Sequence, residues 1–175
     1  STGGALMGNS PPPVNENTCP SPISPYGASK LACEGYIRAY SHSYGFNSFI
    51  LRFGNVYGPF SMHKKGVINK FIKNILENKS VDIYGSLNSS RDYIHSSDIC
   101  QGISLCLEKL ITGDNKKVEC FHLANGEEVK LSRIIEELSK ISKKEIIYKI
   151  KPSRVGEVER NASDFSKARK ILGFS

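Results

Sequence analysis

Residues 49–53 (FILRF) form a short, almost continuous apolar run that ends at Gly54. A run of this length and composition suits a β-strand that is buried on both faces, which is typical of a parallel sheet. The segments on either side of the run therefore have to supply the neighbours that bury it.

Helical and strand-like patterns alternate along the rest of the chain. Apolar residues recur at helical spacing in five segments, at about residues 26–43, 67–76, 99–110, 131–141 and 163–172. Short apolar runs predict further strands at residues 81–84, 121–124 and 146–150. Alternating helices and short strands indicate an α/β fold.

Residues 9–25 contain six prolines among asparagines and serines, so a loop is expected there. Pro25 stands where the first residue of the next helix would, with Ser24 available as the N-cap. The helix is expected to end near Gly45. Its small residues form a face that allows close approach of another helix: Ala28, Ala32, Gly35 and Ala39.

The composition is that of a globular protein, with 39% hydrophobic and 23% charged residues. No apolar run reaches about 18 residues, so no membrane span is expected. The first residues lack the charged and apolar regions of a signal peptide, and we expect a cytoplasmic protein. Five cysteines without a CxxC pair, and four histidines without ligand spacing, predict reduced thiols and no bound metal.

The formal net charge of +7 raises the question of a nucleic-acid partner. The lysines and arginines are spread along the chain rather than gathered in a stripe. Most of them are therefore expected to be solvated surface residues, and a nucleic-acid partner is not expected.

Tyr26 and Lys30 support the main chemical hypothesis. They are four residues apart on the first predicted helix, so both side chains lie on one face. A tyrosine with the ordinary pKa of about 10 is a poor base at neutral pH. A nearby ammonium group stabilises the phenolate, so the pair predicts a general base. The same spacing also arises by chance on surface helices, so the pair alone is weak evidence for a general base. The neighbouring motifs decide whether it is catalytic.

Several motifs accompany this pair in a fixed order. They lie at residues 1–8 (STGGALMG), 25–30 (PYGASK), 52–59 (RFGNVYGP), 91–98 (RDYIHSSD), 154–157 (RVGE) and 163–168 (SDFSKA). Together they resemble the extended short-chain dehydrogenase/reductase family, in its branch of NAD-dependent nucleotide-sugar epimerases and dehydratases similar to UDP-glucose 4-epimerase. The resemblance covers the whole chain.

The resemblance implies that Thr2, Tyr26 and Lys30 are catalytic. Tyr26 would be the acid/base, and Lys30 would hold the ribose of NAD and favour the phenolate, so both also bind the cofactor. Thr2 would orient the reacting oxygen of the sugar. The family's usual spacing places this hydroxyl at Gly3, so Thr2 or its neighbour Ser1 has to supply it.

The resemblance also implies that Asn55, Arg91 and Arg154 bind the diphosphate of a nucleoside-diphosphate sugar. Asn55 follows the buried strand, and ligands of open α/β sheets bind at the carboxyl ends of the strands. A guanidinium group can bind phosphate oxygens through two parallel hydrogen bonds, which suits the two arginines.

The implied architecture is a Rossmann-type parallel sheet with a smaller α/β substrate-binding domain. We expect residues 1–60 in the Rossmann-type domain and residues 61–175 in the substrate-binding domain, with about 92–125 returning to the Rossmann sheet. The sequence contains no glycine-rich strand–turn–helix unit, which is the part that binds the pyrophosphate of NAD. The N-terminal cofactor-binding half is therefore expected to be missing, and the fragment alone to be inactive.

The implied activity of the intact parent is epimerisation at C4 of the sugar through a 4-keto intermediate. Dehydratases of the family usually carry an Asp-Glu pair just after the catalytic threonine, and here Gly3 and Gly4 occupy those places. Epimerase is preferred for that reason, with nucleotide-sugar dehydratase or UDP-glucuronate decarboxylase as alternatives. A truncated, non-catalytic binding domain is an alternative of another class. The family also implies a homodimer for the intact parent.

Overall fold

The computed structural model describes residues 1–59, 61, 66–113 and 118–175. Its helices are α1 (Gly4–Met7), α2 (Pro25–Tyr44), α3 (Val67–Leu76), α4 (Ser96–Ile111), α5 (Leu131–Ser142) and α6 (Ser166–Leu172). Its strands are β1 (Ser48–Phe53), β2 (Asn55–Tyr57), β3 (Val81–Tyr84), β4 (Ser90–Arg91), β5 (Tyr93–His95), β6 (Val118–Leu123), β7 (Val129–Lys130) and β8 (Tyr148–Lys151). The predicted α/β fold is confirmed.

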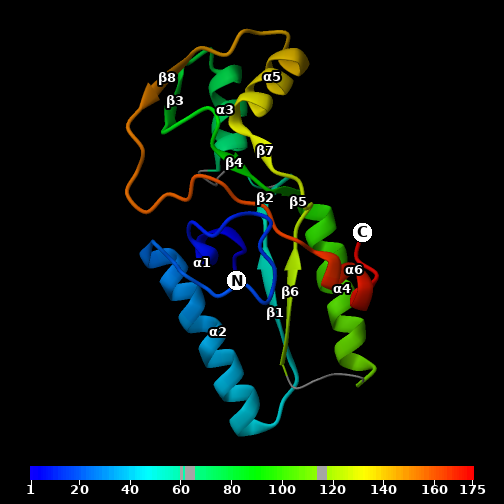
Figure 1. Cartoon of the computed structure of the whole chain (residues 1–175). Coiled ribbons are helices and arrows are strands. Elements are labelled where there is room, and N and C mark those ends of the chain that lie inside the picture. The colour runs from blue at the N-terminus through cyan, green and yellow to red at the C-terminus, as the bar shows by residue number, and fades with distance from the viewer. Residues whose placement is uncertain (60, 62–65, 114–117) are drawn as a thin grey trace.

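The lower body in Figure 1 is built around β1 and β6, which pair in parallel along their whole length. Thr2 forms a parallel bridge with Phe53, so residues 1–3 extend this sheet on the other side of β1. Helix α2 lies on one side of the sheet, and α4 and α6 lie on the other (Figure 1). The sheet is therefore covered by helices on both faces, as the apolar run in β1 requires.

The core of the lower body lies between the sheet, α4 and α6. In β1, Ile50 is buried, whereas Phe49, Leu51 and Phe53 are half-buried and pack against this core. The buried members of the core are Ile94, Ile99, Cys106, Phe121, Leu123, Ala168, Leu172 and Phe174.

Helix α2 begins and ends where the sequence predicts. Ser24 is the N-cap, and its Oγ accepts a hydrogen bond from the Gly27 backbone N at 3.1 Å. Gly45 ends the helix with a φ of 75°, a left-handed conformation that favours glycine. The face that α2 buries against the lower body contains Gly27, Glu34 and Ser41. The small-residue face is exposed in this chain: Ala28, Ala32, Gly35 and Ala39.

The upper body in Figure 1 contains the parallel pair β3 and β8 with helices α3 and α5. Helix α3 and strand β3 have the predicted boundaries. Strand β8 begins at Tyr148 rather than at residue 146, because Ile146 packs into the core beneath α3 and α5. The buried members of this core are Phe71, Val81, Ile83, Leu131 and Ile146.

Short strands, which the sequence analysis missed, lie between the two bodies. Strand β2 pairs with β5 in parallel, and β4 pairs with β7 in antiparallel fashion. None of these strands exceeds three residues, so none has a periodic pattern that a sequence can reveal.

Two helices begin at other residues than predicted, in both cases because of a local hydrogen bond. Helix α4 begins at Ser96, where the His95 side chain accepts a hydrogen bond from Ser97 N. Helix α6 begins at Ser166, whose backbone N donates to Asp164 Oδ1 at 2.9 Å. The helical periodicity predicts the middle of a helix, whereas local hydrogen bonds of this kind help to determine its first residue.

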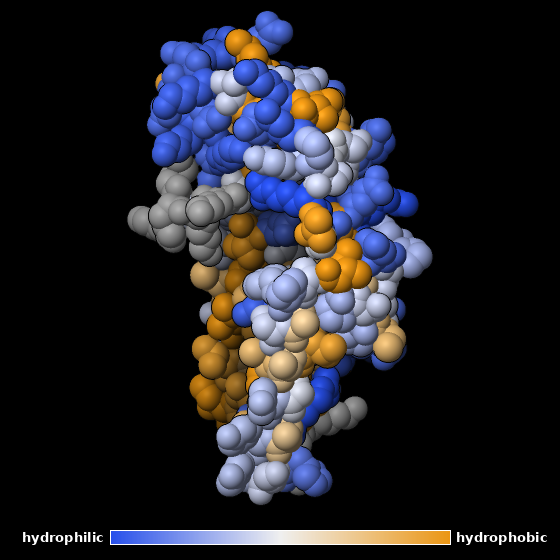
Figure 2. All heavy atoms as spheres, turned by 90° about the vertical axis from the view of Figure 1, so that its left-hand side faces the viewer, coloured by the Kyte–Doolittle hydropathy of each residue, from blue (hydrophilic) through white to orange (hydrophobic). Residues whose placement is uncertain are grey.

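Hydrophilic residues dominate the surface of the upper body, and hydrophobic residues gather on part of the lower body (Figure 2). Among the described residues, none of the helices is both long and apolar enough for a membrane span. The five cysteines are free, and burial raises the pKa of the Cys106 and Cys120 thiols to about 11, which makes them unreactive. The predicted domain boundary stays a prediction, since residue 60 lies outside the described residues.

Candidate functional site

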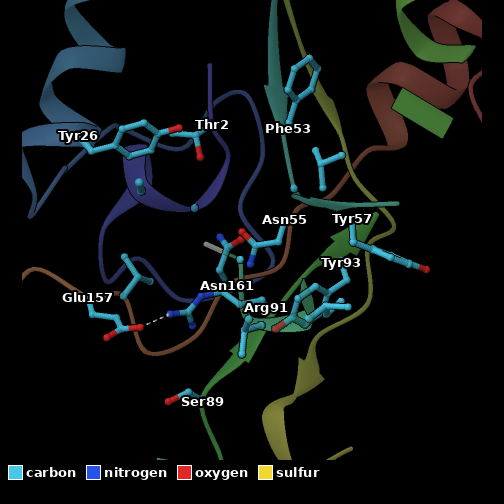
Figure 3. Close-up of a pocket in the computed structure, with 18 of the residues that line it drawn as sticks. Thr2, Tyr26, Phe53, Asn55, Tyr57, Ser89, Arg91, Tyr93, Glu157 and Asn161 are labelled. Atoms are coloured by element: carbon cyan, nitrogen blue, oxygen red, sulfur yellow. Dashed lines mark ion pairs between the residues drawn. The ribbon is translucent and has the colours of Figure 1, made fainter. Parts of the chain in front are cut away.

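A pocket of about 600 Å³ lies between the two bodies, beyond the carboxyl end of β1 (Figure 3). Polar side chains from both bodies line it. The lower body contributes Ser1, Thr2, Ser24, Tyr26 and Asn55, and the segments above contribute Asn69, Tyr84, Ser89, Arg91, Tyr93, Glu157 and Asn161. The carboxyl end of a parallel strand is where ligands bind in open α/β folds.

Tyr26 and Lys30 lie one turn apart on α2, as predicted. The Tyr26 side chain lines the pocket and is 56% exposed. The Lys30 Nζ lies 5.5 Å from the centroid of the Tyr26 ring. The ammonium group is thus close enough to act on the ring electrostatically, while the phenol faces the pocket.

Thr2 lies on the same side of the pocket as Tyr26. Its strand is fixed by the bridge to Phe53 and by a 2.9 Å hydrogen bond from Gly3 N to Phe53 O. Figure 3 shows the Tyr26 hydroxyl directed toward Thr2. The Thr2 hydroxyl and the Tyr26 phenol therefore line the same edge of the pocket.

Gly3 does not face the pocket. A Cβ atom at this position would lie 2.8 Å from Ser163 Oγ and 3.3 Å from His122 Nδ1. A side chain at position 3 would therefore point into the protein, and Gly3 does not line the pocket. Ser1 and Thr2 line the pocket, but the Ser1 hydroxyl oxygen is buried and has no hydrogen-bond partner among the described residues.

Asn55, on β2, and Arg91, on β4, lie beneath this edge. The Asn55 backbone N donates to Asp92 O at 2.6 Å, which fixes the start of β2. Arg91 Nη1 donates to Ser90 O at 2.8 Å, and Arg91 Nη2 lies 3.6 Å from Glu157 Oε1. Figure 3 shows the guanidinium group directed along the pocket toward Glu157.

Arg154 does not join Arg91 in the pocket. Its guanidinium carbon lies 3.9 Å from the centroid of the Tyr84 ring, and Tyr84 lines the pocket. The structure thus brings together Thr2, Tyr26, Asn55 and Arg91. Lys30 and Arg154 each contact an aromatic ring of the lining instead.

Asp92 is an anchor that the sequence analysis did not single out, although it follows Arg91 directly. It is fully buried, and its carboxylate accepts hydrogen bonds from Asn125 N, Gly126 N and Ser163 N at 2.8, 3.0 and 3.1 Å. Burial raises its pKa despite these three bonds. The Asp92 carboxylate thus connects the residues after β6 with the C-terminal segment, while the Asp92 backbone carbonyl accepts the hydrogen bond from Asn55 N.

Asn161, Tyr84 and Tyr93 are further pocket residues that the sequence analysis missed. Asn161 is 5% exposed and lies near Asn55 in Figure 3. Tyr93 lies within the motif at residues 91–98, and its burial raises the pKa of its phenol. The position of Tyr93 beside Arg91 could have indicated it, whereas Asn161 lies between two motifs and no sequence pattern marks it.

A buried polar layer lies between α2 and the sheet. Arg52 Nε and Nη2 donate to the two Glu34 carboxylate oxygens at 2.9 and 2.8 Å, and both side chains are 4% exposed. Burial alone would raise the pKa of Glu34, but the hydrogen bonds from Arg52 hold it below its ordinary value. The pair connects α2, which carries Tyr26, to β1, which leads to Asn55.

His122 lies in the same layer, on β6 opposite Arg52. It is fully buried, and neither ring nitrogen has a hydrogen-bond partner among the described residues. Burial, assisted by Arg52, lowers its pKa from 6.5 to about 4, against the opposing effects of Glu34 and Asp164. His122 is therefore neutral at neutral pH.

Stability is expected to depend on the protonation of His122. Its folded-state pKa is below the unfolded value, so the unfolded chain binds the proton more tightly between pH 4 and 6.5. The free energy of unfolding should rise with pH across this window, by about 3 kcal/mol from this residue. Urea unfolding at pH 4 and pH 7 measures the effect, and His122→Gln should show a smaller rise than the wild type. Equal rises in both proteins would contradict it.

Among the described residues, no cluster of His, Cys, Asp and Glu side chains could hold a metal ion. The site offers instead a phenol, a threonine hydroxyl, an amide and a guanidinium group, a set suited to proton transfer and to anion binding.

Comparison with known proteins gives concordant results. The model of the family described as "NAD dependent epimerase/dehydratase family" matches residues 1–120. The chain is 37% identical over 179 residues to a putative UDP-glucose 4-epimerase of Methanocaldococcus jannaschii, covering 98% of this chain and 55% of that protein.

Two solved structures resemble the chain over almost all of its length. The UDP-glucose 4-epimerase of Thermus thermophilus in complex with NAD has a TM-score of 0.89 at 30% identity, covering 100% of this chain and 57% of that one. The UDP-glucuronic acid 4-epimerase of Bacillus cereus with UDP-glucuronic acid and NAD has a TM-score of 0.90 at 29% identity, covering 99% and 54%. The chain thus spans about half the length of the relatives it matches.

Proposed function

This chain belongs to the NAD dependent epimerase/dehydratase family, and from that premise we propose that it carries the catalytic and sugar-binding residues of an NAD-dependent C4 epimerase of nucleoside-diphosphate sugars. The observation that carries the proposal is the pocket that collects Thr2, Tyr26, Asn55 and Arg91 from segments far apart in the sequence. A proton-transfer group thereby shares one cavity with groups that bind an anionic ligand.

Tyr26 is the acid/base of the proposed reaction. Its phenol faces the pocket, and Lys30 Nζ lies 5.5 Å from the centroid of its ring. The phenolate takes the proton of the sugar C4 hydroxyl as the C4–H bond breaks, and it returns the proton when the 4-keto sugar is reduced on its other face. Thr2 donates to the C4 oxygen and orients it toward Tyr26.

The residues present fit NAD on the Tyr26 side of the pocket. The half-exposed phenol and the neighbouring ammonium group of Lys30 are donors suited to the hydroxyls of a ribose. When bound, NAD accepts the hydride from C4 and gives it back. The 175 residues contain no glycine-rich unit for the pyrophosphate. We therefore expect activity in a protein of the relatives' length that contains this chain, and none in the chain alone.

The diphosphate of the substrate lies, in this proposal, against Asn55 and Arg91. Arg91 is held by Glu157 at 3.6 Å and by backbone carbonyls, so its guanidinium group is already directed along the pocket. Arg154 binds the same diphosphate in this proposal. Its guanidinium carbon lies 3.9 Å from the centroid of the Tyr84 ring. In this proposal the lower body, which includes α6, holds NAD, and the upper body holds the nucleotide.

The surroundings of Gly3 and Gly4 favour epimerisation over dehydration. A Cβ atom at position 3 would meet Ser163 Oγ at 2.8 Å, and one at position 4 would meet Asn161 Cγ at 2.9 Å. An acidic pair at these positions would need both neighbours to shift. The chain therefore lacks the acidic pair that dehydratases of the family use for loss of water.

Turnover of UDP-galactose tests the proposal. A protein of the relatives' length that contains this chain is expected to form UDP-glucose without net formation of NADH, measured by chromatography of the sugar nucleotides. A 4-keto-6-deoxy product, or UDP-xylose from UDP-glucuronate, would replace epimerase by dehydratase or decarboxylase. Binding of UDP without turnover of any of these sugars would favour a non-catalytic binding domain.

A further inference from the structure

The α-carbon of Gly3 is enclosed by two side chains from distant parts of the chain. A Cβ atom there would lie 2.8 Å from Ser163 Oγ, 3.3 Å from His122 Nδ1 and 3.5 Å from His122 Cε1. Both side chains are fully buried. They therefore occupy the space behind the strand end that carries Thr2.

The two side chains are held through their backbones. His122 N donates to Glu16 Oε1 at 2.8 Å, and Ser163 N donates to Asp92 Oδ2 at 3.1 Å. The His122 ring nitrogens and the Ser163 hydroxyl have no hydrogen-bond partner among the described residues. Their role in this structure is therefore the space they fill against Gly3.

Gly3 is held from the opposite direction by β1. Its backbone N donates to Phe53 O at 2.9 Å, and Thr2 forms its bridge with the same residue. The peptide between residues 2 and 3 is thus enclosed by β1 and by the two buried side chains. Because Thr2 precedes Gly3 directly, the position of Gly3 determines where the Thr2 hydroxyl lies in the pocket.

We propose that His122 and Ser163 are positioning residues, which hold Gly3 against β1 and thereby set the Thr2 hydroxyl at the distance from Tyr26 that the reaction needs. The proposal rests on the proposed function. Neither residue lines the pocket, so neither is expected to contact the sugar. A displacement of about 1 Å in a reacting group can lower a rate by about 100-fold, so close packing behind Thr2 has a catalytic consequence.

Gly3→Ala tests the proposal in a protein of the relatives' length. Gly3 has a φ of −75° and a ψ of −46°, which alanine adopts freely, so the added methyl group acts through its contacts alone. We expect kcat for the sugar nucleotide to fall about 100-fold. KM and the affinity for UDP should change little, because Asn55 and Arg91 are not displaced.

A second substitution should reverse this loss. Ser163→Ala removes the Oγ that the new methyl group meets, so the double variant Gly3→Ala/Ser163→Ala should recover most of the lost kcat. Ser142→Ala is the matched control, since its hydroxyl donates to Ser139 O at the end of α5, away from Gly3. Gly3→Ala combined with Ser142→Ala should stay as slow as Gly3→Ala alone.

The possible results separate this inference from the proposed function. A wild type without turnover contradicts the proposed function. An active wild type whose kcat survives Gly3→Ala, or whose loss is not relieved by Ser163→Ala, contradicts the positioning role only. If Gly3→Ala does not fold, His122→Ala removes the support without adding atoms, and it should lower kcat with little change in KM. An unchanged kcat in that variant also overturns the positioning role.

Discussion

Tyr26→Phe is expected to lower kcat for sugar-nucleotide epimerisation by about 10²- to 10⁴-fold in a protein of the relatives' length. The substitution removes only the hydroxyl that takes the proton from C4, and positioned acid/base groups contribute rate factors of this size. The ring stays, and with it the 5.5 Å contact to Lys30 Nζ. Steady-state kinetics with UDP-galactose measures the change.

Tyr36→Phe provides a matched control for this experiment. Tyr36 is a tyrosine of the same helix that is 67% exposed and does not line the pocket. Its replacement should leave kcat unchanged, and neither variant should lose bound NAD or raise KM strongly. Full activity of Tyr26→Phe would contradict the proposed role of Tyr26 as acid/base, and with it the proposed reaction.

The position of Tyr26 follows from how α2 begins. Ser24 caps the helix, and a Cβ atom at Gly27 would overlap the carbonyl oxygen of Ala5. The first turn of α2 therefore lies directly against α1, which follows Thr2 in the chain. The absence of a side chain at position 27 sets the separation between the phenol and the threonine hydroxyl.

The elements with a clear periodic pattern were predicted from the sequence. The predictions for strand β1, for helix α2 with its caps Ser24 and Gly45, and for strand β3 agree closely with the structure. The strands β2, β4, β5 and β7 could not be predicted, because two or three residues contain no repeat and their pairing depends on distant partners.

The candidate site was predictable where residues lie in motifs. Thr2, Tyr26, Asn55 and Arg91 were singled out from the sequence, and they line one pocket. Arg154 was expected to bind the same diphosphate as Arg91, which stays a prediction. Arg154 stacks on Tyr84, a residue of the pocket lining, and such ring contacts depend on side-chain conformation. Asn161 reaches the pocket because the C-terminal segment is held at Ser90 and Asp92, long-range constraints that no local pattern reveals.

The burial of Glu34 is another feature that the helical pattern did not predict. The expectation for α2 concerned its small and apolar residues, whereas the structure turns Glu34 toward the sheet. The reason lies in β1, where Arg52 occupies a buried position of an otherwise apolar strand. A buried guanidinium group requires a charged partner, and α2 is the element that can supply it.

Glu34→Ala is expected to reduce the free energy of unfolding of the chain by about 3–5 kcal/mol. The substitution leaves the Arg52 guanidinium group, at 4% exposure, without its carboxylate, and breaking a buried pair from one side is costly. Urea unfolding measures the loss. Glu77→Ala is the control, since Glu77 and Lys79 also lie 2.8 Å apart but with side chains 38% and 68% exposed. That exposed pair should contribute little, because solvent screens it.

The double variant Glu34→Leu/Arg52→Met separates the value of the pair from the cost of an unpaired charge. Replacing both partners by apolar residues of similar size is often neutral, so the double variant should be more stable than Glu34→Ala. If it is equally unstable, the pair itself stabilises the fold, and the argument from the unpaired charge is wrong. If it is stable, the pair determines the orientation of α2 on β1 and adds little to the free energy of unfolding. Because α2 carries Tyr26 and β1 leads to Asn55, a shift between them would then appear as a loss of kcat in a folded protein.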